Sequence, residues 1–286
     1  MNKDTTYSFI IPHKNCPDLL QRCINSIPER KDIQIIIVDD NSDDDKKPTI
    51  VRSDVEIILL GAEQSQGAGR ARNVGINKSK GQWLLFPDSD DYYCEGFLNV
   101  LDKFVLTTID VVYFNFEYKD GVTGASLPSL HFRGDFDCYD GSKSSEEAIR
   151  FHHNVPWTKM VKKAFVIENK IQFEEVPNGN DILFSITIGS LASRIEVIKL
   201  PLYVYLRNTN SITQRQLTEN DAFCVLLHII QLNCFYKSKG HPEWCMPIFK
   251  KTVFYIKVCG LSIFHLFKKR MTTIYHHRKD WSVQLR

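Results

Sequence analysis

The strongest chemical signal in the sequence is the triplet Asp88-Ser89-Asp90, which follows the apolar run 83–86. A short apolar run of this kind predicts a buried strand, so both aspartates can turn toward one point where that strand ends. Two carboxylates held together repel each other unless a cation joins them, and Mg²⁺ or Mn²⁺ binds a few carboxylates together with substrate phosphates. The triplet therefore indicates a metal-assisted phosphate site, although a solvated turn also favours aspartate at a strand end.

Two further polar segments occupy comparable positions. Asp39-Asp40 follows the apolar run 33–38, and an acidic residue at this point of a nucleotide-binding fold commonly accepts hydrogen bonds from a ribose or base. An Asx-type turn would explain the same residues structurally. The segment 67–73 begins a predicted helix with two glycines and carries Arg72, which can pair with the acidic strand ends or lie on the surface as a solvated charge.

Apolar runs alternate with stretches of helical spacing through the first 115 residues, and this alternation predicts the elements that position the polar segments. The pattern is typical of βαβ units and of an open, doubly wound α/β sheet. Ligands of such sheets bind outside the carboxyl ends of the strands, where the acidic segments lie. The predicted strands span 7–11, 33–38, 55–60, 83–86 and 110–116, and the predicted helices span 17–27, 67–79 and 96–106.

The remaining residues divide into a less regular part and a helical part. After residue 120 the sequence predicts helices near 144–152 and 180–191 and strands near 195–199 and 202–206. Helical spacing returns in two segments rich in Phe, Ile, Leu and Cys. These two segments span 217–238 and 244–268.

Composition excludes several classes of protein. The 286 residues are 43% hydrophobic, with ordinary numbers of Gly, Pro and Cys, which excludes a disordered, collagen-like or disulfide-scaffold protein. The eight cysteines form no C-x-x-C pair, which favours reduced, buried thiols. The net charge of +2 hides an asymmetry, because residues 237–286 carry 11 basic and two acidic side chains, so that a region of +9 follows one of −7.

Such a basic region indicates contact with an anionic surface, either nucleic acid or a membrane. No nucleic-acid-binding module accompanies the charge, so we expect no nucleic-acid partner. The aromatic residues and lysines of 244–268 suit either a helix packed on the domain or a helix lying on an anionic membrane. Since the longest apolar stretch, 252–267, is too short to span a bilayer and no signal peptide is visible, we expect a cytoplasmic protein, peripheral on the inner face of the membrane if this region binds it.

The order and spacing of four motifs resemble those of family 2 glycosyltransferases. These motifs are Phe-Ile-Ile-Pro at 9–12 with Asn15, Ile-Val-Asp-Asp-Asn-Ser at 37–42, Ala-Arg-Asn-x-Gly-Ile at 71–76 and Phe-Pro-Asp-Ser-Asp-Asp at 86–91. Three later segments extend the resemblance as far as residue 213. They are W-x-K-M at 157–160, a variant of the family's E-D-x-x-F at 180–184, and the Tyr205 to Ser-Ile-Thr stretch that ends at 213.

The resemblance implies a GT-A fold, which is a Rossmann-like, mostly parallel open sheet with flanking helices, followed by a basic, aromatic-rich helical region at 216–286. The glycosyltransferase domain would span 1–215, with a nucleotide-sugar-binding half at 1–115 and an acceptor-binding half at 116–215. The implied activity is metal-dependent, inverting transfer of one sugar from a nucleotide-sugar, a UDP-sugar, to a glycan or lipid-linked acceptor in surface polysaccharide synthesis. Neither the Q-x-x-R-W motif nor the membrane spans of processive relatives occur, and the sequence sets no oligomeric state.

The resemblance also implies a role for each motif of the donor half. Asp40, with Asp39 beside it, would contact the nucleoside, and Arg72 would help to hold the base. Asp88 and Asp90 would bind Mn²⁺ or Mg²⁺, with Asp90 as the direct ligand. The donor-binding set is completed by Pro12, His13, Asn15 and Ser89, of which His13 could instead be structural.

In the acceptor half, Asp181 matches the family's catalytic base and would take the proton of the acceptor hydroxyl. Asn180 replaces the glutamate usual before it, and an amide cannot act as a base. Alternatively, Asp181 merely caps a helix that begins at Ile182. Trp157 and Lys159 are assigned to the acceptor side, where Trp157 either stacks on a sugar ring or packs in the core.

Two other functions fit the same fold. A sugar nucleotidyltransferase needs a glycine-rich phosphate loop with a basic residue after the first strand, and Pro-His-Lys-Asn-Cys-Pro at 12–17 matches this poorly. A non-catalytic sugar-binding protein would have no need of the aspartates at 88, 90 and 181, which are all present. The sequence therefore favours the glycosyltransferase.

Overall fold

The computed structural model describes residues 5–128, 134–176, 178–208, 218–247 and 253. The chain forms two compact units, one made of residues 1–175 and 180–211 and the other of 176–179 and 212–286. The first unit contains the sheet. The second contains helix α8, Glu219–Ser238, which begins with a capping box between Thr218 and Asp221.

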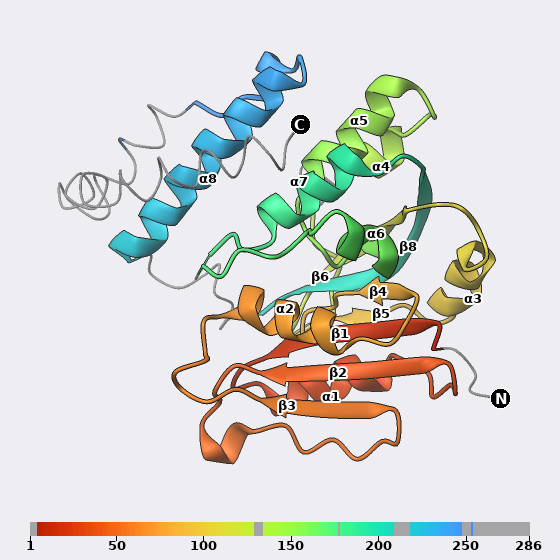
Figure 1. Ribbon diagram of the computed structural model, residues 1–286, viewed down its shortest axis with the longest axis vertical. Helices are drawn as coiled ribbons and strands as arrows, with labels where there is room; N and C mark the ends of the chain where they lie inside the picture. The colour runs from red at the N-terminus through yellow and green to blue at the C-terminus, as the bar shows by residue number, and fades with distance from the viewer. Residues whose placement is uncertain (1–4, 129–133, 177, 209–217, 248–252, 254–286) are drawn as a thin grey trace. The chain divides into compact units, whose positions relative to one another are not determined.

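An eight-stranded sheet in the order β3-β2-β1-β4-β7-β6-β8-β5 forms the centre of the first unit (Figure 1). The neighbours β3, β2, β1 and β4 are parallel, whereas β7 runs antiparallel to both β4 and β6. At the far edge β8 is parallel to β6 and antiparallel to β5. The strands are β1 Tyr7–His13, β2 Ile33–Asp39, β3 Val55–Leu59, β4 Trp83–Leu85, β5 Tyr92–Tyr93, β6 Val111–Asp120, β7 Lys159–Lys162 and β8 Ile195–Arg207.

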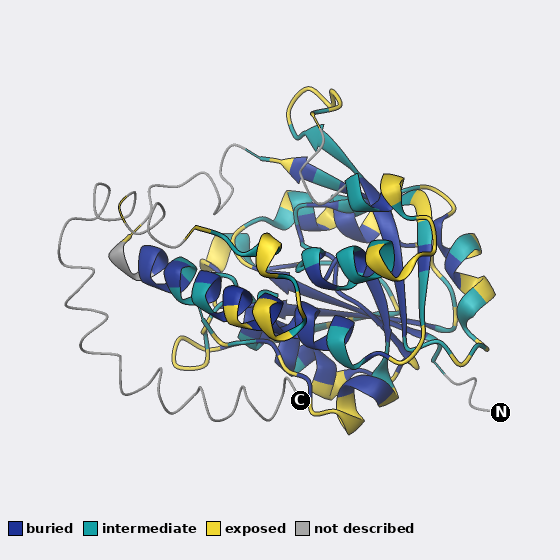
Figure 2. Ribbon diagram, turned by 90° about the horizontal axis from the view of Figure 1, so that it is seen from above, coloured by how far each residue is buried: buried dark blue, intermediate teal, exposed yellow. Residues whose placement is uncertain are grey.

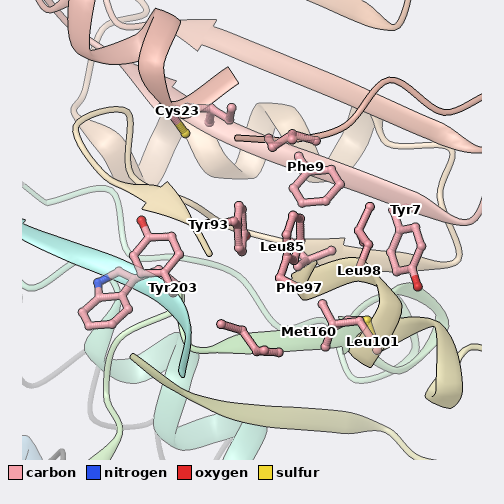
Figure 3. Packing of buried hydrophobic residues seen from close by; sticks show 14 of the residues in the cluster. Tyr7, Phe9, Cys23, Leu85, Tyr93, Phe97, Leu98, Leu101, Met160 and Tyr203 are labelled. Atoms are coloured by element: carbon pink, nitrogen blue, oxygen red, sulfur yellow. The ribbon is translucent and has the colours of Figure 1, made fainter. Parts of the chain in front are cut away.

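Helices cover both faces of this sheet, because side chains alternate along each buried strand. On β1, Phe9 packs with α1 and α3 on one face, and Ile10 packs with α2 and α7 on the other. Figure 3 shows the first face, where the rings of Tyr93 and Phe97 stack 4.1 Å apart, and Figure 2 shows the buried strands between the helical layers. The helices are α1 Pro17–Asn25, α2 Ala68–Lys78, α3 Phe97–Leu101, α4 Gly134–Cys138, α5 Lys143–His152, α6 Lys163–Glu168 and α7 Ile182–Leu191, with 3-10 turns at Asp44–Lys46, Asp102–Phe104 and Pro242–Trp244.

The α/β class, the open sheet and the flanking helices are confirmed, and the sheet is more mixed than the mostly parallel one expected. The two predicted strands near 195–206 form one strand, β8, which is irregular where Asn115 of β6 pairs with Pro201. Two strands were missed because β5 has two residues and β7 has a lysine at each end, so neither forms an apolar run. Of the helix predicted at 244–268 the structure describes 244–247, where a 3-10 turn ends and no helix begins, and residue 253. The rest of that helix and most of the basic region lie outside the described residues.

The parallel strands position the polar segments as expected. His13 and Asp39 are partners in the β1–β2 register, so the two strands end side by side. β4 lies on the other side of β1 and leads into the acidic triplet. Among the described residues, no helix is both long and apolar enough to cross a membrane.

The antiparallel strand β7 begins with a lysine that is fully buried. The ammonium group of Lys159 donates hydrogen bonds to the backbone carbonyls of His153, at 2.5 Å, and Val155. It also lies 5.2 Å from the centre of the Tyr113 ring. Burial lowers the pKa of Lys159 to about 7, and attraction by the carboxylate of Asp181 opposes this shift. Lys159 therefore holds the segment that enters β7 from inside.

We expect replacement of Lys159 by methionine to change how the free energy of unfolding depends on pH. Burial holds the pKa of Lys159 at about 7 in the folded chain, against an ordinary value of 10.5. Between these values the unfolded chain binds more protons, so Lys159 makes the wild type more stable as pH rises, by at most about 1.4 kcal/mol per pH unit. Denaturant unfolding of both proteins across this range measures the difference, and a difference that does not vary with pH would contradict the assignment.

Candidate functional site

A buried hydrogen-bonded cluster joins the ends of β1 and β2. His13 Nδ1 lies 2.7 Å from Asp39 Oδ1, and Ser42 donates to the same carboxylate through its hydroxyl at 2.5 Å and its N–H at 3.0 Å. Because His13 Nε2 accepts from the N–H of Cys16 at 3.3 Å, we assign the ring proton to Nδ1, which donates to Asp39. Burial raises the pKa of Asp39, but the hydrogen bonds from Ser42 and His13 outweigh it and hold the pKa below its ordinary value. His13 and Asp39 thus fix both strand ends from inside.

Asp40 binds the loop that precedes α2. Its two carboxylate oxygens accept hydrogen bonds from the N–H groups of Gln66 and Gly67, each at 3.1 Å. Gly67 has a φ of 85°, a left-handed conformation that glycine adopts without strain, and α2 begins at the next residue. The ammonium of Lys14 lies 3.5 Å from the same carboxylate. Asp40 therefore orients the start of α2 at the strand-end edge.

The segment after β1 is tied to the segment after β2. The N–H of Asn15 donates to Ser42 Oγ, and the side-chain oxygen of Asn15 accepts from the N–H of Asp43, both at 2.8 Å. Pro12 is buried within β1 and is paired in register with Val38. The exposed Asn15 is thus held in one place above the two strand ends.

Arg72, on α2, lies between the acidic triplet and the start of α7. Its Nη2 donates to Asp88 Oδ1 at 2.6 Å, and its Nη1 donates to Asn180 Oδ1 at 2.9 Å. The guanidinium carbon lies 5.2 Å from the centre of the Phe173 ring. Arg72 is only 4% exposed. It pairs inward, and it brings together residues 16 and 108 positions away.

Asp90 is the second carboxylate of the triplet. One of its oxygens accepts from the side-chain amide of Asn208 at 3.0 Å, and its backbone carbonyl accepts from Arg22 at 2.8 Å. Burial raises the pKa of Asp90, and the nearby charge of Asp88 raises it further. Between the two aspartates, Ser89 Oγ lies 3.2 Å from the Cys16 sulfur. The charged form of Asp90 is therefore disfavoured unless a cation joins the site.

A further carboxylate, Asp91, was missed by the sequence argument. It is fully buried and accepts from the hydroxyl of Tyr203 at 2.9 Å and from the N–H of Leu206 at 2.8 Å. The same hydroxyl accepts from the N–H of Asp88 at 3.0 Å. Burial raises the pKa of Asp91 well above its ordinary value, and the charges of Asp90 and Asp88 add to the shift. The continuation of the acidic run to position 91 was the available signal, but its partner lies 112 residues away.

Asp88 and Asp90 could together supply part of the coordination of a divalent cation, with the remaining ligands coming from a bound substrate. One oxygen of each carboxylate is used, by Arg72 and by Asn208, which leaves a second oxygen on each for an ion. Within the described part of the chain, no group of three or more His, Cys, Asp or Glu residues could form a cage by itself. Mg²⁺ characteristically binds one or two carboxylates together with substrate phosphates, which is the donor set available here.

Asp181 occupies the N-cap position of α7, which is the position that the alternative to a catalytic role requires. Its backbone carbonyl accepts from the N–H of Ser185 at 3.0 Å, but its side chain makes no capping hydrogen bond. Its carboxylate attracts the ammonium of Lys159 strongly enough to affect the pKa of that lysine. The position is that of a cap, whereas the side chain does not act as one.

Trp157 and Lys159, both assigned to the acceptor side, are core residues. Trp157 is 4% exposed and stacks on Tyr203 and Tyr205, with ring centres 5.1 and 5.2 Å apart. Of the two alternatives for Trp157, packing in the core is the one that the structure shows. Lys159 is fully buried beneath the segment at 153–155, so neither side chain presents its polar group at the surface.

The chain is similar to known glycosyltransferases in sequence. A model of the family described as glycosyl transferase family 2 matches residues 8–168. EpsH of Bacillus subtilis is 25% identical over 230 residues, which cover 73% of this chain and 62% of EpsH. The glycosyltransferase GlyG of Streptococcus pneumoniae is 28% identical over 225 residues, which cover 73% of each protein.

The protein TarS of Staphylococcus aureus, a poly(ribitol-phosphate) beta-N-acetylglucosaminyltransferase, is 25% identical over 212 residues, which cover 70% of this chain and 35% of TarS. A crystal structure of TarS 1–349 with UDP-GlcNAc superposes with a TM-score of 0.61 at 22% identity, covering 79% of this chain and 66% of that one. This likeness shows the GT-A type of fold. Since the family model covers more than half of its length, the chain belongs to glycosyl transferase family 2.

Proposed function

We propose that this chain transfers one sugar from a UDP-sugar to a hydroxyl group of a glycan or lipid-linked acceptor in surface-glycan synthesis. The observation that carries the proposal is the meeting of Asp88 and Asp90 with the ends of β1 and β2 at one edge of the parallel strands. The relatives support it, because GlyG is named a glycosyltransferase and TarS was crystallised with UDP-GlcNAc.

For the donor, we infer that Asp88 and Asp90 hold Mn²⁺ or Mg²⁺ beside the diphosphate. When bound, the ion offsets the charge on the diphosphate as it leaves. Asp90 is the more direct ligand in this proposal, because Asp88 is already paired with Arg72. Ser89 lies between them and contacts Cys16, which keeps the triplet close to the start of α1.

The nucleoside lies over the ends of β1 and β2 in this proposal. Asp40 contributes from the end of β2, while Asp39 and His13 act from beneath by fixing the strand ends. Pro12 and Asn15 shape the surface above β1. Arg72 helps to hold the base of the nucleoside from its position beside Asp88, to which it donates a hydrogen bond, and not as a surface charge.

For the chemical step, Asp181 is the proposed base. Its carboxylate takes the proton of the acceptor hydroxyl while that oxygen forms a bond to the anomeric carbon. The bond from the anomeric carbon to the diphosphate oxygen breaks on the opposite face, and the electron pair leaves with the diphosphate. One such displacement inverts the anomeric configuration. Asn180 cannot share this role, since an amide does not accept the proton near neutral pH.

The acceptor is proposed to approach over the half at 116–215. Trp157 and Lys159 support this half from the core, where they contact Tyr203 and the carbonyl of His153. We further propose that the basic region 237–286 keeps the chain at the cytoplasmic face of an anionic membrane, close to a lipid-linked acceptor. Of this region the structure describes 237–247 and 253.

Replacement of Asp90 by alanine is expected to abolish the Mn²⁺-dependent part of UDP binding, because one of two cation ligands is lost. Calorimetric titration of UDP in the presence of Mn²⁺ and of a chelator measures that part. Asp137→Ala, at an exposed aspartate of α4, is the matched control and should bind as the wild type does. An unchanged Mn²⁺ dependence in Asp90→Ala would refute the metal assignment.

Replacement of Asp181 by asparagine should leave UDP affinity in Mn²⁺ close to that of the wild type and lower turnover by about a hundredfold to ten-thousandfold, because the base is lost. Turnover is followed as UDP release from the sugar nucleotide that most stabilises the chain in a thermal-shift screen with Mn²⁺. Wild-type turnover in this variant would remove Asp181 as the base. If the wild type itself binds sugar nucleotides without releasing UDP, a non-catalytic sugar-binding protein is favoured.

A further inference from the structure

The side chain of Arg72 connects two parts of the site that carry different proposed roles. One amino group of its guanidinium holds Asp88, in the acidic triplet, at 2.6 Å, and the other holds Asn180, the residue before Asp181, at 2.9 Å. The guanidinium donates through N–H groups on separate atoms whose directions are fixed by its plane, whereas the donors of a lysine all lie on one atom. The link joins α2, the end of β4 and the start of α7 through one buried cation.

Few other contacts hold this guanidinium. The Nε atom of Arg72 is buried and has no hydrogen-bond partner within the described part of the chain. The Phe173 ring lies against the guanidinium but does not fix its rotation within the plane. The direction of the fork is therefore set by Asp88 on one side and Asn180 on the other. If either partner is removed, the other loses the orientation that the fork imposes.

Asp88 and Asn180, the two partners of Arg72, are each anchored by a hydrogen bond of their own backbone. The N–H of Asp88 donates to the hydroxyl of Tyr203 at 3.0 Å, which fixes the backbone of the triplet. The carbonyl of Asn180 accepts from the N–H of Glu174 at 3.0 Å. The next carbonyl, that of Asp181, accepts from the N–H of Ser185 at 3.0 Å and begins the hydrogen bonding of α7. A shift of Asn180 therefore moves Asp181 and the first turn of that helix.

The neutral side chain at position 180 strengthens one half of the link. Where a glutamate would share the charge of Arg72, Asn180 offers only an amide oxygen, so among the described residues Asp88 is the one carboxylate that pairs with this arginine. Charge-assisted hydrogen bonds are stronger than neutral ones. The stronger bond to Asp88 therefore sets the position of Arg72, and the bond from Arg72 sets the position of the Asn180 side chain.

We propose that Arg72 and Asn180 are positioning residues that make the placement of Asp181 depend on Asp88. The role of Asp181 as base rests on the proposed function, whereas the link itself does not. Loss of the amide oxygen at position 180 should lower turnover and leave UDP affinity nearly unchanged. Loss of the Asp88 carboxylate should loosen the start of α7 even without any ligand.

The test measures amide hydrogen exchange in the ligand-free chain, in a peptide that covers the first turn of α7 and includes Ser185. The variants are Asn180→Leu, which removes the acceptor at similar size, Asn180→Asp, which keeps an acceptor, and Asp88→Ala. Gln34→Leu is the matched control, because Gln34 is as buried as Asn180, at 9% exposure, and its amide bonds the backbone of Lys78 and Lys80 at the far end of α2. Asn180→Ala replaces the leucine variant if that variant does not fold.

We expect exchange in this peptide to be about tenfold faster in Asn180→Leu and in Asp88→Ala, and near that of the wild type in Asn180→Asp and Gln34→Leu. The double variant Asn180→Leu with Asp88→Ala should exchange no faster than either single one, because both break the same link. Normal exchange in Asp88→Ala, or additive effects in the double variant, would overturn the proposal.

A second measurement separates positioning from stability. Asn180→Leu should lower turnover by about tenfold, with UDP affinity in Mn²⁺ within about threefold of the wild type. Gln34→Leu should lower the melting temperature without this split between turnover and UDP affinity. If no variant and no wild type turns over a sugar nucleotide, the proposed function fails, and the ligand-free exchange still decides whether the link exists.

Discussion

The repulsion among three carboxylates at the end of β4 is the constraint on which the rest of the site depends. Asp88, Asp90 and Asp91 occupy four consecutive positions with one serine, and burial and mutual repulsion raise the pKa values of the last two. Each carboxylate has its own partner, namely Arg72, Asn208, and Tyr203 with the N–H of Leu206. These partners come from α2, from β8 and from the residue after β8. The arrangement of the three carboxylates therefore depends on elements that are distant in the sequence. A divalent cation would relieve the negative charge that remains and could in turn bind a diphosphate.

Buried hydrogen bonds also fix the ends of the neighbouring strands β1 and β2. His13, Asp39 and Ser42 close β1 against β2, and Asp40 fixes the loop before α2. Most of the residues assigned to the donor therefore act through one another. Such mutual support gives preorganised groups at the edge of a rigid sheet, which is what a site that stabilises a leaving diphosphate requires. In this account the half-buried Asp88 and Asp90 bind the ligand, and the buried groups keep them in place.

The sequence predicted what local patterns determine. Apolar runs located β1, β2 and β4 because buried parallel strands are continuously hydrophobic, and they also located the partly exposed edge strand β3. Aspartates after β2 and β4 located the edge of the sheet where the strands end. The contacts of Arg72 with Asn180 and of Asp91 with Tyr203 were not predictable, because each pair is more than 100 residues apart in the chain. The burial of Lys159 was not predictable for a related reason, since its carbonyl partners lie in the irregular segment 153–155, which has no periodic pattern. Strand β7 was not recognised because a lysine stands at each end of its four residues.

The central claim is that the acidic triplet binds a nucleotide diphosphate through a divalent cation at the strand-end edge. The most direct measurement is an anomalous difference map from crystals of the chain grown with UDP and Mn²⁺. The account predicts one strong peak in contact with Asp90, next to Asp88 and the diphosphate, with the uridine over the ends of β1 and β2. A well-ordered UDP bound elsewhere, or bound at this edge with no Mn²⁺ peak beside the two carboxylates, would contradict it.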